Sequence, residues 1–327
     1  MKLPSIHKSF QELRIVFMGT PEFAVASLTA LLQAGCNIVG VITAPDKPAG
    51  RGMKLGESPV KKLALEKNLP LLQPEKLKDP FFLKNLAQWK ADVQIVVAFR
   101  MLPELVWNMP PLGTLNLHGS LLPDYRGAAP INWAVINGET ETGVTTFRLQ
   151  QEIDTGNILL QEAMPIGPNE TAGEVHDRMK EIGARLVVKT LQEWVAGRLE
   201  ETPQKELLSR YPRSHSLKPA PKLFPDTGRI DCTKSAREVH NLIRGLSPHP
   251  GAFILLGPKK LKIFKSECLS QPLSSNKQPG EVWSTDRSGF FLQCSDAPLS
   301  ILEVQLEGKK KMPVKEFLLG YRFNPET

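Results

Sequence analysis

The stretch that decides the fold is Asp92-Val-Gln-Ile-Val-Val-Ala-Phe99, an almost uninterrupted run of β-branched and apolar residues. Such a run is typical of a strand buried on both faces, because a strand with one face in water alternates apolar and polar residues. Arg14-Ile-Val-Phe-Met18 and Asn37-Ile-Val-Gly-Val-Ile42 have the same character. The segment between them, Phe23 to Ala34, has a helical pattern that Gly35 ends. These elements predict a mostly parallel α/β sheet with helices on both faces.

The same alternation continues to about residue 200. Ser58-Pro59 opens a helix, with Ser as N-cap and Pro in the first turn. Thr171 and Glu174 form a capping box that begins a long helix ending near Val195. Three more strands are predicted, at Gly113–His118, Gly143–Leu149 and Asn157–Met164.

The chain changes character from Leu207 to Asp226, where four prolines predict an extended linker. Beyond it we expect one helix, Ser235 to Arg244, and short strands separated by Gly, Pro, Ser and Asn. The predicted strands are Ala252–Leu256, Leu261–Lys265, Glu281–Ser284, Phe290–Gln293 and Leu299–Val304. Strands of this length around one helix predict a small β-barrel resembling an oligonucleotide-binding fold. The expected domains are 1–206, a linker at 207–226, and 227–327.

Composition excludes several classes of protein. The chain has 327 residues, of which 41% are hydrophobic and 23% charged, as in an ordinary soluble protein of about two domains. No apolar run approaches the roughly 18 residues of a membrane helix, and the N-terminus lacks the apolar core of a secretory signal. The four cysteines are scattered without a C-x-x-C, which fits a reducing cytoplasm.

The net charge of +7 is unevenly distributed. Residues 1–206 carry 22 basic and 23 acidic side chains, whereas residues 207–327 carry 19 basic and 11 acidic ones. A basic module joined to a neutral one indicates a polyanionic partner such as a nucleic acid. Basic surfaces also aid solubility, so charge alone leaves both interpretations open.

Common nucleotide and metal motifs are missing from the sequence. The first strand is followed by Gly19-Thr-Pro-Glu22 and not by G-x-G-x-x-G, and no G-x-x-x-x-G-K-[ST] occurs. No H-E-x-x-H or clustered His/Cys set indicates a metal, and no G-x-S-x-G indicates a serine hydrolase. We therefore expect neither a dinucleotide nor a metal cofactor.

The most informative segment runs from Asn116 to Pro130, Asn-Leu-His-Gly-Ser-Leu-Leu-Pro-Asp-Tyr-Arg-Gly-Ala-Ala-Pro. On a strand, Asn116 and His118 share one face, near the carboxyl end where α/β proteins bind ligands. An amide and an imidazole there can stabilise a carbonyl that becomes an oxyanion. An ordinary strand end bonded to a loop would explain the same residues.

A carboxylate follows in Glu152-Ile-Asp154-Thr-Gly156, between two predicted strands. Alone, Asp-Thr-Gly is a common turn sequence. Together with His118, Asp154 supplies the partner that orients an imidazole and keeps it protonated.

These residues resemble the family of formyltransferases that use 10-formyltetrahydrofolate. The resemblance rests on Asn116-x-His118-x-Ser-Leu-Leu-Pro123-x-x-Arg-Gly127 and Asp154-Thr-Gly156. Met18-Gly-Thr-Pro-Glu-Phe23, Pro45-Asp-Lys-Pro-Ala-Gly-Arg-Gly52, Ala220-Pro-Lys-Leu223 and Gly228-Arg-Ile-Asp231 resemble the branch that acts on methionyl-tRNA. The match runs from about Leu13 to Phe317. Residues 1–12 lie outside it, and Arg100 stands in a Phe99–Pro103 loop that is shorter than usual.

The resemblance implies a Rossmann-like formyltransferase domain, a linker and a C-terminal barrel that binds tRNA. It implies formyl transfer from 10-formyltetrahydrofolate to the methionine amine of initiator methionyl-tRNA, for translation initiation, without a metal, a membrane or an obligate protein partner. Asn116, His118 and Asp154 would be catalytic. The expected folate-binding residues are Ser120, Leu121, Leu122, Pro123, Arg100, Met101, Leu102 and Pro103.

The loop after the second strand, Asp46 to Leu55, has the Gly, Pro and Lys content of a solvated surface loop. The resemblance implies that it reaches the acceptor end of the tRNA, where Gly50 and Gly52 would let the backbone approach closely. The expected tRNA-binding residues are Lys47, Arg51 and Lys54 of this loop, with Lys218 and Lys222 of the linker.

Three alternative functions remain open from the sequence. A formyltransferase acting on a nucleotide-linked sugar or glycinamide ribonucleotide would share the three polar residues without needing the basic C-terminal region. A hydrolase of formyltetrahydrofolate would use water in place of the amine. A non-catalytic RNA-binding protein would have no use for Asn116, His118 and Asp154 together.

Overall fold

The computed structural model describes residues 3, 6, 8–49, 54–209, 216–269, 276–285 and 289–320. The chain divides into two compact units. The first contains residues 1–127, 143–164 and 176–218, and the second contains residues 128–142, 165–175 and 219–327.

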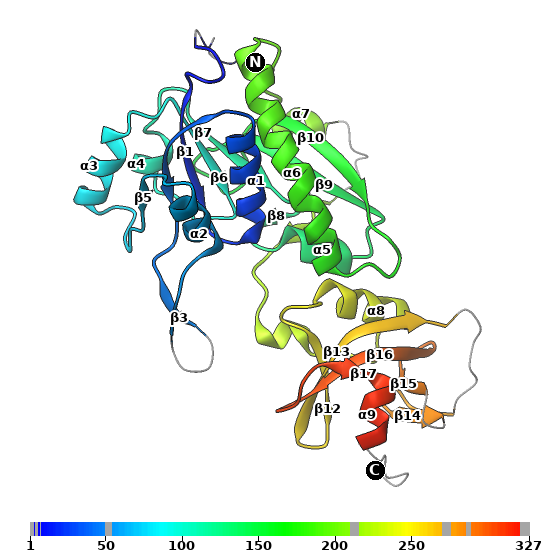
Figure 1. The fold of residues 1–327 in the computed structure, drawn as a ribbon. Coiled ribbons are helices and arrows are strands. Elements are labelled where there is room, and N and C mark those ends of the chain that lie inside the picture. The colour runs from blue at the N-terminus through cyan, green and yellow to red at the C-terminus, as the bar shows by residue number, and fades with distance from the viewer. Residues whose placement is uncertain are drawn as a thin grey trace. The chain divides into compact units, whose positions relative to one another are not determined.

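The first unit is built on a sheet in the order β10-β9-β7-β6-β1-β2-β5 (Figure 1). Its strands are β1 (Arg14–Gly19), β2 (Asn37–Ile42), β5 (Leu71–Leu72), β6 (Val93–Val97), β7 (Thr114–His118), β9 (Glu141–Arg148) and β10 (Ile158–Pro165). The pairs β1–β2, β1–β6, β2–β5 and β6–β7 are parallel, and β9 runs antiparallel to β7. The mostly parallel sheet predicted from the apolar runs is confirmed.

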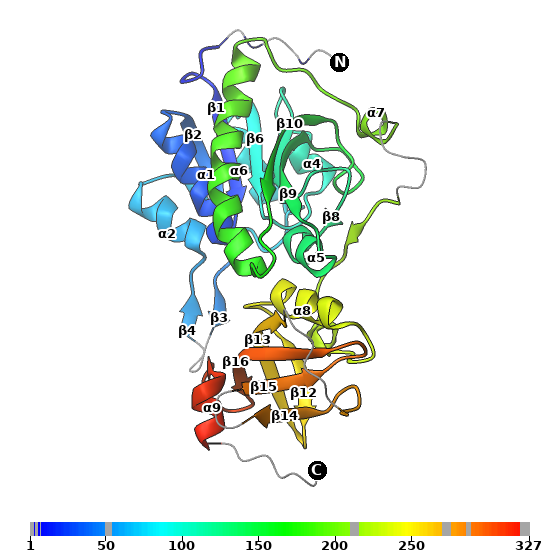
Figure 2. The ribbon, with the colours of Figure 1, turned by 90° about the vertical axis from the view of Figure 1, so that its right-hand side faces the viewer.

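Helices cover both faces of this sheet. They are α1 (Glu22–Gln33), α2 (Pro59–Glu66), α3 (Pro80–Gln88), α4 (Glu104–Trp107), α6 (Ala172–Val195) and α7 (Gln204–Leu208). Val16 and Met18 of β1 pack with Phe82 of α3 and Val106 of α4 in one buried cluster. On the other face α1 and α6 lie side by side (Figures 1 and 2).

The predicted helix starts are confirmed by their hydrogen bonds. The Ser58 side chain accepts from the Lys61 main-chain N–H at the start of α2. Thr171 and Glu174 bond reciprocally before α6. The sequence analysis did not identify α3, nor the hairpin of β3 (Lys47–Ala49) and β4 (Lys54–Gly56) within the predicted surface loop. Residues 50–53 lie outside the described residues.

The second unit is an antiparallel sheet with helices packed against it. Its sheet order is β12-β13-β16-β15-β14, with β17 beside β16. The elements are β11 (Pro219–Ala220), a 3-10 helix (Pro225–Gly228), α8 (Ala236–Gly245), β12 (Ala252–Leu256), β13 (Lys259–Cys268), β14 (Val282–Thr285), β15 (Gly289–Gln293), β16 (Pro298–Leu306), β17 (Met312–Pro313) and α9 (Val314–Gly320). The helix and the five predicted strands are confirmed, whereas β17 and α9 were not predicted. Of the predicted fold class, an α/β domain and a β-barrel, the structure confirms the α/β domain and shows the C-terminal one as an antiparallel sheet.

Two short segments from earlier in the chain complete the second unit. Helix α5 (Pro130–Ile136) packs on α8, and Asn132 donates from Nδ2 to the Gly245 carbonyl over 2.8 Å. Buried Arg244 donates to the main-chain carbonyls of Gly167 and Glu170. The residues in these contacts lie more than 70 positions apart in the sequence.

No helix among the described residues is long and apolar enough to cross a membrane.

Candidate active site

The candidate site lies at the carboxyl edge of the central strands of the first unit. Strands β6 and β7 are parallel neighbours, with Val96 opposite Asn116 and Val97 opposite Leu117. The segment after β6 and the end of β7 therefore leave the sheet at the same edge, where open α/β sheets bind ligands. His118 is the last residue of β7 and is buried, with 7% of its surface exposed.

The imidazole of His118 is held on two sides. Its Nε2 lies 2.8 Å from the main-chain carbonyl oxygen of Tyr125. A carbonyl oxygen only accepts, so Nε2 carries a proton and donates it. The ring of Phe147 meets the imidazole edge-on, with centroids 6.4 Å apart and planes at 83°. These contacts fix the plane of the ring.

Asp154 faces the other ring nitrogen. Its Oδ2 lies 3.7 Å from Nδ1 of His118 and accepts a hydrogen bond of 2.9 Å from the Gly127 main-chain N–H. Both ring nitrogens of His118 thus face acceptor oxygens. The pairing of Asp154 with His118 expected from the sequence is present as an ion-pair contact, longer than a hydrogen bond.

The Asp154-Thr-Gly156 turn has this sequence for steric reasons. Asp154 has φ +54°, in the left-handed region that Asp tolerates better than most residues. A Cβ atom on Gly156 would lie 1.7 Å from the carbonyl oxygen of Arg148, so only glycine fits. Close packing of the turn against the end of β9 is what brings the Asp154 carboxylate to His118.

The loop after β7 is held by hydrogen bonds within itself and to β9. Ser120 is fully buried and donates from Oγ to the Asp124 carbonyl over 2.7 Å. Thr145 of β9 donates to the Ser120 carbonyl and accepts from the Leu122 N–H. Of the expected folate residues in this loop, Ser120, Leu122 and Pro123 are buried and Leu121 is half-buried. The Ser120 hydroxyl is bonded within the loop, and burial of Leu122 and Pro123 leaves Leu121 as the most exposed side chain of the four.

The other four expected folate residues lie around one open hollow. Arg100, Met101, Leu102 and Pro103 line a cavity of about 500 Å³ together with Leu77, Lys78, Glu104 and Leu105. Met101 is 76% exposed. The guanidinium of Arg100 donates to the carbonyls of Pro74 and Glu75. The apolar side chains of this cavity lie beside Lys78 and Arg100. Such a surface can accept a flat aromatic ring that carries an anionic group.

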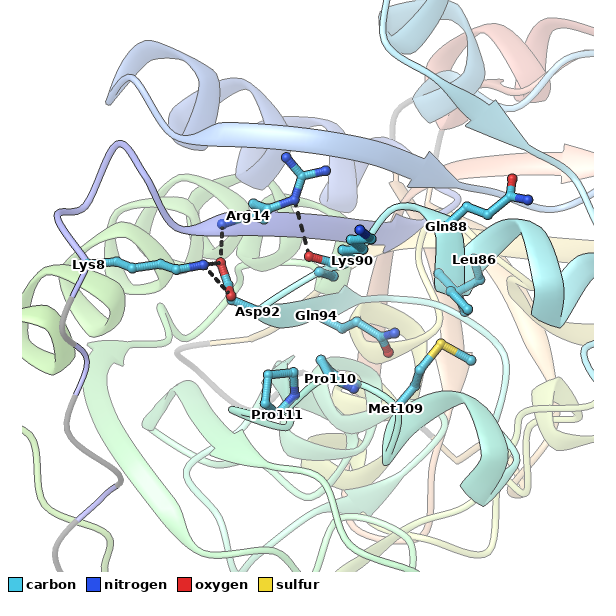
Figure 3. A pocket seen from close by; sticks show the side chains of 12 residues that line it. Lys8, Arg14, Leu86, Gln88, Lys90, Asp92, Gln94, Met109, Pro110 and Pro111 are labelled. Atoms are coloured by element: carbon cyan, nitrogen blue, oxygen red, sulfur yellow. Dashed lines mark hydrogen bonds and ion pairs between the residues drawn. The ribbon is translucent and has the colours of Figure 1, made fainter.

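A larger cavity, of about 890 Å³, lies at the opposite edge of the sheet (Figure 3). There Lys8 donates to both carboxylate oxygens of Asp92, and the main-chain N–H of Arg14 donates to one of them. These polar groups satisfy one another at the amino ends of β1 and β6. Size alone therefore does not make this cavity the candidate site.

The residues expected to bind tRNA lie on different elements, and one of them lies outside the described residues. Lys47 is exposed in β3, Lys54 lies in β4, and Arg51 lies outside the described residues. Asp46 at the base of the hairpin bonds Lys61 and Gln73, and the hydrogen bond from Lys61 lowers its pKa.

The two linker lysines differ from each other. Lys222 is exposed, with Nζ 5.8 Å from the Phe224 ring centroid. Lys218 is half-buried, and its main chain accepts from the Tyr125 N–H and donates to Asp124.

Two groups at the site were missed by the sequence analysis, the carbonyl of Tyr125 and the side chain of Gln204. Gln204 donates from Nε2 to the carbonyls of Asp154 and Gly156, both over 2.8 Å. Neither has a local sequence signal, because a main-chain carbonyl has none and Gln204 stands 50 residues from Asp154.

A buried histidine that faces a carboxylate, two residues after an asparagine near the carboxyl edge of the sheet, offers the donors that can stabilise an oxyanion in acyl transfer. Comparison with known families agrees. The formyl transferase model matches residues 13–191, and the model of the formyl transferase C-terminal domain matches residues 222–322. The chain therefore belongs to the formyl transferase family.

Alignments with relatives in the family cover nearly the whole chain. Methionyl-tRNA formyltransferase of Bacteroides fragilis is 51% identical over 95% of this chain and 96% of its own length. The protein of the same name from Porphyromonas gingivalis is 46% identical over 97% and 98%. The fold also matches an N-formyltransferase of Helicobacter canadensis crystallised with folinic acid and dTDP-3-aminofucose, with TM-score 0.67, 21% identity and 92% and 100% coverage.

Proposed function

We propose that the chain transfers the formyl group of 10-formyltetrahydrofolate to the amino group of the methionine on initiator methionyl-tRNA, for translation initiation. The observation that carries the proposal is the contact between His118 and Asp154. His118 follows Asn116 by two residues on the same strand. The full-length match to relatives named methionyl-tRNA formyltransferase supports the substrate. Four unpaired cysteines support a reducing cytoplasm as its location.

The proposed chemistry is direct transfer. The methionine amine forms a C–N bond with the formyl carbon, and the carbonyl electrons move to oxygen. Collapse of this oxyanion breaks the bond to the folate nitrogen, which takes up a proton while the amine loses one. No covalent enzyme intermediate is needed.

Two donors would stabilise the oxyanion in this proposal. Asn116 donates from its amide, and His118 donates from Nε2 after exchanging the Tyr125 carbonyl for the oxyanion. The exchange is favourable because a charged acceptor makes a stronger hydrogen bond than a neutral carbonyl. Each such donor is typically worth about 100- to 1,000-fold in rate. Asp154 holds the ring and accepts the proton of the amine through water.

The proposed roles of the remaining parts follow from their position and charge. Residues 1–206 form the catalytic domain, 207–226 the linker, and 227–327 the domain that supplies most of the tRNA affinity. The folate is bound by the segment Arg100, Met101, Leu102 and Pro103 and by the loop Ser120, Leu121, Leu122 and Pro123. Lys47, Arg51, Lys54, Lys218 and Lys222 contact the tRNA.

The test offers the purified protein labelled 10-formyltetrahydrofolate together with charged initiator tRNA, a panel of small amines, or buffer alone. We expect label on the tRNA only. Label on a nucleotide-linked sugar amine or glycinamide ribonucleotide would favour a small-amine formyltransferase. Release of labelled formate in buffer would favour a hydrolase, and no turnover of any kind would favour a protein that only binds RNA.

A further inference from the structure

We propose that Gln204 is a positioning residue for formyl transfer, because it holds together the two loops that orient His118. The inference rests on the proposed function and adds a residue to it. Gln204 begins α7 and has 3% of its surface exposed. It lies 50 residues after Asp154 and has no direct contact with Asn116 or His118 among the interactions of the described residues.

The first of the two loops is the turn that carries Asp154. Nε2 of Gln204 has two protons, and it donates them to the carbonyls of Asp154 and Gly156 over 2.8 Å each. These carbonyls flank Thr155, so the amide fastens both ends of the turn. Because Asp154 has φ +54°, its conformation depends on such outside restraints.

The second loop carries the groups that face His118 and Asp154. Oε1 of Gln204 accepts from Nε and Nη2 of Arg126. On either side of Arg126, Tyr125 presents its carbonyl to Nε2 of His118, and Gly127 donates its N–H to Asp154. The contacts close a ring that runs from Gln204 through Arg126 and Gly127 to Asp154 and back.

The main chain fixes the place of Gln204 in this ring. Ile158 and Thr202 exchange two hydrogen bonds of 2.9 Å, a bridge between the start of β10 and the segment before α7. Gly156 precedes Ile158 by two residues and Gln204 follows Thr202 by two, so the bridge brings the amide to the turn. The two donors and the two acceptor sites of the buried Gln204 amide are all used. Removing the amide would leave its buried partners without hydrogen bonds, which costs stability.

The test compares Gln204→Leu and Gln204→Glu with Gln94→Leu. Gln94 is fully buried in β6 of the same unit, accepts from Thr114 Oγ1, and takes no part in the ring. Gln204→Leu removes every bond of the amide. Gln204→Glu keeps the shape and the acceptor for Arg126 but loses both donors, and it decides the question if Gln204→Leu does not fold.

We expect both Gln204 variants to lower kcat for formylation of methionyl-tRNA by about 10-fold or more, since small misplacements of catalytic groups cost this much or more. KM for folate and for tRNA should stay within about twofold. Amide hydrogen exchange in the substrate-free protein should rise at residues 125–127 and 154–156 beyond its rise elsewhere. Gln94→Leu should alter Tm without these effects.

A Gln204→Glu variant with wild-type kcat would overturn the inference. Exchange that rises uniformly over the unit would also overturn it, if Gln94→Leu lowers kcat as much as the Gln204 variants do at a similar loss of Tm. An inactive wild type would contradict the proposed function instead, and the exchange experiment would still test the ring because it needs no turnover.

Discussion

Oδ2 of Asp154 lies 3.7 Å from Nδ1 of His118 while accepting a hydrogen bond from the Gly127 N–H. One carboxylate thus contacts both the imidazole of His118 and the loop that follows β7. A change in its charge should act on catalysis, and a change in its hydrogen bonding should act on the loop.

Asp154→Asn separates these two roles. The amide oxygen can still accept from Gly127, but the negative charge facing His118 is removed. We expect formyl transfer to fall by about 100-fold or more with little change in tRNA affinity. Combining it with His118→Ala should cost much less than the product of the single effects, because the two residues act as a unit. Single-turnover formylation measures both, and fully multiplicative losses would contradict the pairing.

Gly156→Ala should destabilise the first unit. Its Cβ would lie 1.7 Å from the Arg148 carbonyl oxygen, which is main chain and must shift. We expect a loss of roughly 1–3 kcal/mol, the range for overpacking, measured as a lower Tm by circular dichroism. Gly320→Ala is the matched control because nothing lies within 4 Å of its added methyl. Equal Tm values for the two variants would show that the turn has room.

His240 should make the second unit sensitive to acid. The ring is buried between Ser266 Oγ and the Pro168 carbonyl, and burial lowers its pKa below the ordinary 6.5. Below about pH 6.5 His240 becomes protonated in the unfolded chain, while the buried ring of the folded chain stays neutral. The contribution of His240 to stability is therefore present above that pH and is lost as the pH falls toward the pKa of the folded state.

The measurement is Tm between pH 7.5 and 5.5 for wild type and His240→Gln. We expect the variant to lose less stability over this window than wild type does, whatever its stability at pH 7.5. His249→Gln, at an exposed position, should follow the wild-type curve. Parallel curves for wild type and His240→Gln would rule out His240 as the source of acid sensitivity.

Binding of tRNA should depend steeply on salt, because residues 207–327 carry 19 basic and 11 acidic side chains. Filter binding across salt concentrations gives the slope of log Kd. Replacing exposed Lys260 and Lys309 by Ala should reduce that slope by about 0.9 for each phosphate that is no longer neutralised. The same replacement at exposed Lys67 and Lys76 of the first unit should change it less. Salt-insensitive binding by wild type would refute the electrostatic account.

The sequence was most informative where a function depends on local periodicity. Alternation along β7 places Asn116 and His118 on one face, and Asp154-Thr-Gly156 marks a turn by its residue types alone. The parallel sheet followed from strands too apolar to have a wet face. The capping residues Ser58 and Thr171 marked the starts of α2 and α6 for the same reason, since a cap is a short-range interaction.

What depends on distant main-chain geometry could not be predicted in this way. The Tyr125 carbonyl reaches His118 in a loop where Tyr125 has a φ of +60°. Tyrosine at this position does not predict that conformation. Gln204 joins the site through the bridge between Ile158 and Thr202. The main chain of Ser120 and Leu122 is likewise bonded to Thr145 of β9, 23 to 25 residues further along the chain.

The most direct test of the central claim is formylation of charged initiator tRNA by wild type and by His118→Ala, at equal concentrations and with folding checked by circular dichroism. If His118 and Asp154 act as proposed, the variant will bind tRNA with wild-type affinity and transfer labelled formyl at least about 100-fold more slowly. A His118→Ala enzyme that keeps about half of the wild-type rate would contradict the account.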